Sequence, residues 1–170
     1  MKKLLILAPL ALSLMAQSNP ISTAVKANYT GIKNNLVKSA DKMPEELYSF
    51  KATADVRGFG QLIGHVANAA YSYCAAAAGE KNPNTINIEK EKTSKADLSQ
   101  ALKDAFAFCD TVYDGMTDAK GAELVKRGNN EVARLGILVS NSTHMNEHYG
   151  NIVTYMRLKN LVPPSSEPRK

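Results

Sequence analysis

Residues 131–160 read EVARLGILVSNSTHMNEHYGNIVTYMRLKN, and apolar side chains recur in them every three or four positions. This period is typical of one face of an α-helix. The face consists of Leu135, Leu138, Ser142, Met145, Tyr149, Ile152 and Met156. The stretch therefore predicts a long amphipathic helix from about Glu131 to Asn160, which ends before the Pro163-Pro164 pair.

Three further helices are expected before this one, and no stretch is a convincing strand. Their predicted ranges are Pro20 to about Asp41, about Arg57 to Ala78, and about Ser94 to Asp114. Four amphipathic helices in one domain predict an all-α four-helix bundle.

The link between the second and third helices, Glu80–Thr93, is long. Fourteen residues of extended chain reach roughly 45 Å, whereas a helix of about 21 residues is roughly 30 Å long. This link can therefore cross the whole bundle and leave the second and third helices parallel. The link between the third and fourth helices, residues 115–130, is also long and is expected to contain no strand.

The first sixteen residues have the layout of a cleaved secretory signal. Two lysines precede a largely apolar stretch, Leu4–Met15, which is shorter than the ~20 residues that a membrane span needs. Cleavage is expected after Ala16, or after Ser18 with Ala16 at the −3 position. We therefore expect residues 17–170 to form one exported domain, periplasmic or secreted, that does not insert into a membrane.

The charge of the chain does not favour a nucleic-acid partner. Lys and Arg number 21 against 16 Asp and Glu, and loss of Lys2 and Lys3 with the signal lowers the net charge from +5 to +3. The remaining basic residues are scattered among acidic ones. Such a surface is solvated and does not match a phosphate-binding footprint.

Three histidines are the main candidates for chemistry. His144 and His148 are four positions apart, so their imidazoles share one face of the predicted helix. One helix can hold a metal ion with this spacing. His65 lies at the edge of the apolar face of the second helix and could supply a third ligand, leaving a coordination position open. The alternative is three partly buried histidines without a metal.

Five polar residues lie near these histidines along the sequence, and each has two interpretations. Asn141 could hydrogen-bond a water on the metal or line the bundle, and Tyr155 could line the pocket or pack in the core. Gln61 and Asn68 could orient the histidine of the second helix or simply be surface residues. Glu147 is the nearest carboxylate and a conceivable general base, or part of a solvated helix face.

Four segments resemble the DinB-like superfamily of metal-binding four-helix bundles: Val56–Val66, Asn141–Gly150, Asn151–Lys159 and Val162–Ser166. The resemblance covers most of the chain after the signal and is strongest in the second and fourth helices. It implies a long crossover between the second and third helices, and one divalent metal ion held by His65, His144 and His148. Zn, Ni, Fe and Mn are all compatible with three imidazole ligands.

The resemblance implies less about activity. Some relatives are transferases or isomerases that use a low-molecular-weight thiol, and an exported member would lack that cytoplasmic co-substrate. Three neutral ligands favour a metal-dependent hydrolase or transferase that acts on a small molecule. The alternative is a non-catalytic metal-binding or stress-related interaction module. By analogy with relatives, weak homodimerisation through a helix face is also expected.

Two cysteines complete the candidates. Cys74 lies about seventeen residues into the second helix, and Cys109 about fifteen residues into the third. If these helices are parallel neighbours in an oxidising compartment, the two thiols lie at similar height and could form a disulfide. Otherwise both are ordinary buried thiols.

Overall fold

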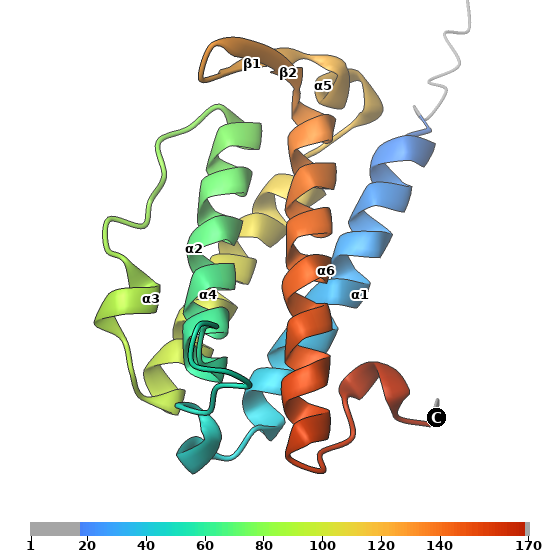
Figure 1. The fold of residues 1–170 in the computed structure, drawn as a ribbon. Helices are drawn as coiled ribbons and strands as arrows, with labels where there is room; N and C mark the ends of the chain where they lie inside the picture. Colours follow the sequence, from blue (N-terminus) through green and yellow to red (C-terminus); the bar gives the residue numbers. More distant parts are fainter. Residues whose placement is uncertain (1–17, 169–170) are drawn as a thin grey trace, which may run out of the picture.

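A computed structural model describes residues 18–168 (Figure 1), and the predicted signal, residues 1–16, lies outside the described residues. The four long helices are α1 (Pro20–Lys42), α2 (Phe59–Ala78), α4 (Lys95–Asp114) and α6 (Arg134–Leu158). The short elements are η1 (Glu45–Leu47), α3 (Ile88–Glu91), α5 (Asp118–Ala122), β1 (Leu124–Arg127), β2 (Asn130–Ala133) and η2 (Pro164–Ser166). The predicted all-α bundle is confirmed.

The four long helices run in two parallel pairs (Figure 1). Helices α1 and α6 point one way, whereas α2 and α4 point the other way. Contacts between α2 and α4 keep the same order along both helices, because Gly60 packs on Leu98 and Cys74 lies beside Cys109. The chain between them therefore crosses the bundle, as predicted, and on its way it forms α3, which the sequence pattern did not predict.

The predicted apolar faces form the core. In α6, six of the seven residues of the predicted face are buried and Leu135 is half-buried. Helix α4 begins as expected, because the Ser94 hydroxyl accepts a hydrogen bond from the Asp97 N–H at 3.0 Å. Among residues 18–168, none of the helices is long and apolar enough to cross a membrane.

The prediction that residues 115–130 contain no strand is wrong. Strands β1 and β2 pair antiparallel, with Val125 opposite Val132. The two-residue loop between them places Gly128 first, with a positive φ of 63°, which is typical of a tight hairpin turn. Because β2 occupies Asn130–Ala133, helix α6 begins at Arg134, three residues later than predicted.

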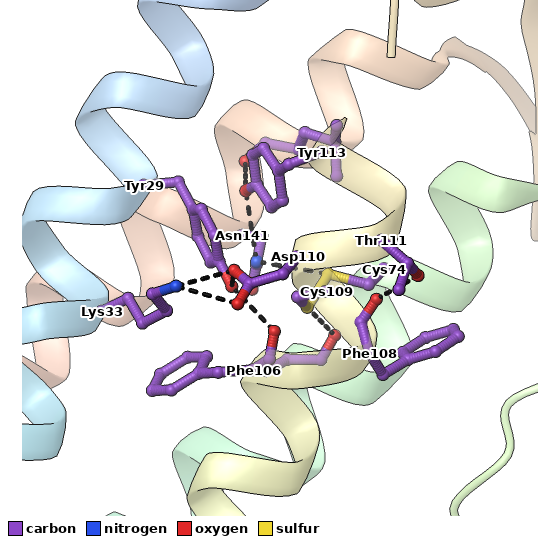
Figure 2. The surroundings of a disulfide bond; sticks show 12 residues. Tyr29, Lys33, Cys74, Phe106, Phe108, Cys109, Asp110, Thr111, Tyr113 and Asn141 are labelled. Carbon is purple, nitrogen blue, oxygen red and sulfur yellow. Dashed lines mark hydrogen bonds and ion pairs between the residues drawn. A yellow bond between two sulfur atoms is a disulfide. The ribbon is translucent and has the colours of Figure 1, made fainter. Parts of the chain in front are cut away.

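A disulfide joins Cys74 of α2 to Cys109 of α4, with Cα atoms 5.4 Å apart (Figure 2). Both side chains are fully buried. All four long helices meet around it, since Tyr29 of α1 stacks on Tyr113 of α4 and Asn141 of α6 contacts Tyr113.

Candidate metal centre

The fold brings the three histidines of α2 and α6 to one point. Nε2 of His144 lies 3.3 Å from Nε2 of His65 and 3.1 Å from Nε2 of His148. One ligand nitrogen from each ring lies within 4.8 Å of the other two. Nitrogens bound at ~2.1 Å to one tetrahedral ion are about 3.4 Å apart. The cluster therefore has the spacing of three ligands to a single ion.

The hydrogen-bonding capacity of the rings also fits a cation. An imidazole nitrogen carries either one proton or one lone pair in the ring plane. Nε2 of His144 faces two other Nε2 atoms, so hydrogen bonding can satisfy only one of these contacts. Nδ1 of His144 and of His148 is buried with no hydrogen-bond partner among residues 18–168. A divalent ion at the centre would accept a lone pair from all three Nε2 atoms.

Burial keeps two of the rings uncharged. Burial, followed by the neighbouring imidazoles of His144 and His65, lowers the pKa of His148 to about 4. Burial also lowers the pKa of His144, and His65 acts in the same direction. Both rings are neutral at pH 7, and neutral imidazole is the form that binds a metal.

Glu89 is the polar partner of this site that the sequence pattern missed. Its Oε2 lies 3.1 Å from Nδ1 of His65, and its Oε1 accepts a hydrogen bond from Nε of Arg57 at 2.8 Å. The run Glu89–Lys92 looks like solvated chain in the sequence. The available signal was Ile88, an apolar residue inside this polar link, which is buried in the structure.

A cavity of about 480 Å³ lies beside the histidine cluster. Its lining consists of Asp55, Val56, Arg57, Leu62, Glu89, His148, Asn151 and Tyr155. Tyr155 was predicted either to line the pocket or to pack in the core, and it does both. Its ring packs edge-on against Phe50, and its hydroxyl donates to the backbone oxygen of Arg57 at 2.6 Å.

The β1–β2 hairpin approaches the histidines from another side. The Arg127 guanidinium lies 4.5 Å from the ring centre of Tyr73, and this ring lies 5.7 Å from that of His144. Since the hairpin was not predicted, neither was this contact.

The remaining sequence candidates have other contacts. Asn141 is fully buried and donates to the Tyr113 hydroxyl, beside the disulfide (Figure 2). Gln61 accepts from the Gly58 N–H and caps α2. Asn68 accepts from the Ile88 N–H and so holds the crossover. Glu147 is exposed and is not part of the cavity lining.

Comparisons with known proteins agree with this architecture. A crystal structure of a DinB-like protein from Bacillus cereus is similar with a TM-score of 0.72 at 17% identity, covering 84% of this chain and 95% of that one. The DinB-like protein YjoA from Bacillus subtilis has a TM-score of 0.69 at 17% identity, covering 86% of this chain and 99% of that one. A conserved protein from Enterococcus faecalis has a TM-score of 0.65 at 15% identity, covering 81% of this chain and 95% of that one.

At these identities the structural likeness shows the fold alone. No curated protein matches the chain significantly. A family model described as the DinB superfamily matches residues 29–152, which include all three histidines. The chain therefore belongs to the DinB superfamily.

Proposed function

We propose that the chain is a metal-dependent hydrolase or transferase that acts on a small molecule and holds one divalent ion through His65, His144 and His148. The observation that carries the proposal is the cavity of about 480 Å³ with His148 in its wall. A structural metal site is usually closed by four protein ligands, whereas a catalytic site keeps a position open to substrate.

When bound, the ion would supply Lewis acidity at a position open to the substrate. The chain supplies the binding surface around it. Nε of Arg57 donates a hydrogen bond to Glu89. The two terminal nitrogens of the Arg57 guanidinium have no hydrogen-bond partner among residues 18–168, so they can bind an anionic group. The Tyr155 hydroxyl holds the backbone of Arg57, while Leu62 forms an apolar part of the wall. The wall also carries Asp55 and Glu89, so these features favour a small polar substrate whose anionic group, if present, lies at Arg57.

One observation favours the alternative, a non-catalytic metal-binding module: the carboxylate of Glu89 is not free to act as a base. This is the carboxylate that contacts the histidine cluster, and both of its oxygens are engaged, one by His65 and one by Arg57. A general base needs an oxygen within hydrogen-bond reach of the proton it removes. Glu89 is therefore poorly placed to act as one.

We also propose that the domain works outside the cytoplasm, after removal of residues 1–16. The Cys74–Cys109 disulfide supports this location, because structural disulfides persist in oxidising compartments.

Metal analysis of the purified domain, followed by a panel of hydrolase and transferase substrates, tests the function. We expect one divalent ion per chain, which His144→Ala loses in dilute chelator together with any turnover. Asn146→Ala is the matched control, because Asn146 is exposed on the same helix. Metal content unchanged in His144→Ala overturns the site. Metal binding without turnover across the panel supports the non-catalytic alternative.

A further inference from the structure

We infer that Glu89 is a positioning residue for the metal centre. The crossover between α2 and α4 holds its carboxylate against His65. The inference rests on the proposed metal site. Glu89 belongs to α3, and its side chain is 18% exposed where it meets Nδ1 of His65. Although Glu89 also lines the cavity, its carboxylate is engaged by His65 and Arg57, so we assign it the role of setting the orientation of a ligand.

Helix α3 can reach His65 because residue 64 is glycine. A Cβ at Gly64 would lie 2.7 Å from Cα and 3.0 Å from N of Glu89. Any side chain at this position would push α3 away from α2. A glycine inside a helix costs about 1 kcal/mol relative to alanine, so the close approach gives a physical reason for Gly64 in the middle of α2.

Two further contacts fix the position of α3 along α2. Asn68 accepts a hydrogen bond from the Ile88 N–H at 3.0 Å and donates one to Oδ1 of Asn87 at 3.0 Å. The Ile88 side chain is buried in the core. With the residue before it held in this way, Glu89 has little freedom to move along the helix.

The carboxylate then selects the state of the imidazole. An ionised carboxylate only accepts hydrogen bonds, so it requires the proton of His65 on Nδ1. This tautomer leaves the lone pair on Nε2, which faces His144. Arg57 donates to the other carboxylate oxygen and holds its orientation. Outer partners of this kind contribute 10- to 100-fold to metal affinity.

Two measurements on the purified domain test the inference. In Co²⁺ titrations against a competing chelator, Glu89→Ala should bind 10- to 100-fold more weakly than wild type. Glu89→Gln, which keeps an acceptor oxygen, should be intermediate. Nitrogen NMR of the metal-free protein should show His65 protonated on Nδ1 in wild type and a mixture of tautomers in Glu89→Ala. The control is Glu91→Gln in the same segment, because Glu91 contacts the Asn87 N–H and not the histidine.

The role of Gly64 is tested in the same titrations. Gly64→Ala should weaken Co²⁺ binding. Combining it with Glu89→Ala should cause no further loss, because both changes remove the same contact between Glu89 and His65. Gly31→Ala is its control, since a Cβ at that position of α1 meets nothing within 4 Å. Wild-type affinity in Glu89→Ala, or an unchanged His65 tautomer, overturns the inference. A wild-type chain that binds no metal overturns the proposed function instead.

Discussion

At the residue scale, His148 illustrates how burial prepares a ligand. The residue is 6% exposed, and its Nε2 lies 3.1 Å from that of His144. Burial removes water from the protonated ring, and the neighbouring imidazoles also disfavour its positive charge. Both effects lower the pKa of His148 to about 4. The folded chain therefore holds this ring in its metal-binding form even without a metal.

This depressed pKa predicts how the stability of the metal-free protein changes with pH. An unfolded histidine binds its proton with a pKa near 6.5, whereas folded His148 does so at about 4. Between these values the unfolded chain binds more protons, so the free energy of unfolding should fall as pH decreases from about 6.5 to about 4. Above about pH 6.5 the contribution of His148 is fully present. Urea unfolding at a series of pH values measures this change.

The control for the pH series is His148→Asn, which keeps a small polar side chain but cannot titrate in this range. Its free energy of unfolding should depend less on pH than that of wild type. Equal slopes for the two proteins would contradict the assignment to His148.

At the scale of elements, the crossover is held to α2 by Asn68, Ile88 and Glu89 together. Helix α3 has only the four residues Ile88–Glu91, which is too short to be stable as an isolated helix in water. Its order therefore depends on tertiary contacts, namely the Asn68 hydrogen bonds and the buried Ile88 side chain.

Asn68→Ala should consequently loosen the crossover without unfolding the bundle. Loss of its hydrogen bonds should lower the free energy of local opening by about 1–2 kcal/mol. Because 1.4 kcal/mol corresponds to a tenfold change, amide hydrogen exchange at Ile88 and Glu91 should accelerate about tenfold. Amides of α4 should keep their wild-type rates. Asn34→Ala, at an exposed asparagine of α1, is the matched control. Equal acceleration throughout the bundle would show that Asn68 acts globally.

At the scale of the whole molecule, the disulfide links parallel helices that the chain connects only through the long crossover. It closes a loop with a sequence separation of 35 residues. The chain-entropy model gives a stabilisation of about 4 kcal/mol for a loop of this length. Since Tyr29 of α1 and Asn141 of α6 pack around it, all four long helices depend on this region.

Removal of the disulfide should therefore destabilise the bundle without changing its fold. Cys74→Ala/Cys109→Ala should lower the free energy of unfolding by about 2–4 kcal/mol, as measured by urea unfolding. The circular dichroism spectrum of the folded variant should match that of wild type. A reductant can reach the buried bond once the chain unfolds. Wild type unfolded in reductant should therefore show the same lower urea midpoint as the double variant. Two free thiols titrating in the denatured, unreduced wild type would contradict the bond.

The amino-acid pattern alone predicts the four long helices, their apolar faces, the crossover and the histidine pair of α6. Each of these depends on local information. A 3.6-residue period places Met145 and Ile152 on one face, four residues of spacing align His144 with His148, and Ser94 marks a helix start through its own side chain. The length of the link between α2 and α4 allowed a crossover, and the resemblance to the DinB-like superfamily implied one.

Long-range packing, in contrast, sets which residues from the links reach the site. Glu89 meets His65 across 24 residues of sequence, and the Tyr155 hydroxyl meets the Arg57 backbone across 98. Such pairs leave no period in the sequence, because they arise when buried groups such as Ile88 anchor a polar segment to the bundle. The β1–β2 hairpin was missed for a similar reason, since short strands are stabilised by pairing with each other and by packing on the folded chain. Local patterns therefore predict the scaffold, whereas long-range packing selects the partners of the histidines.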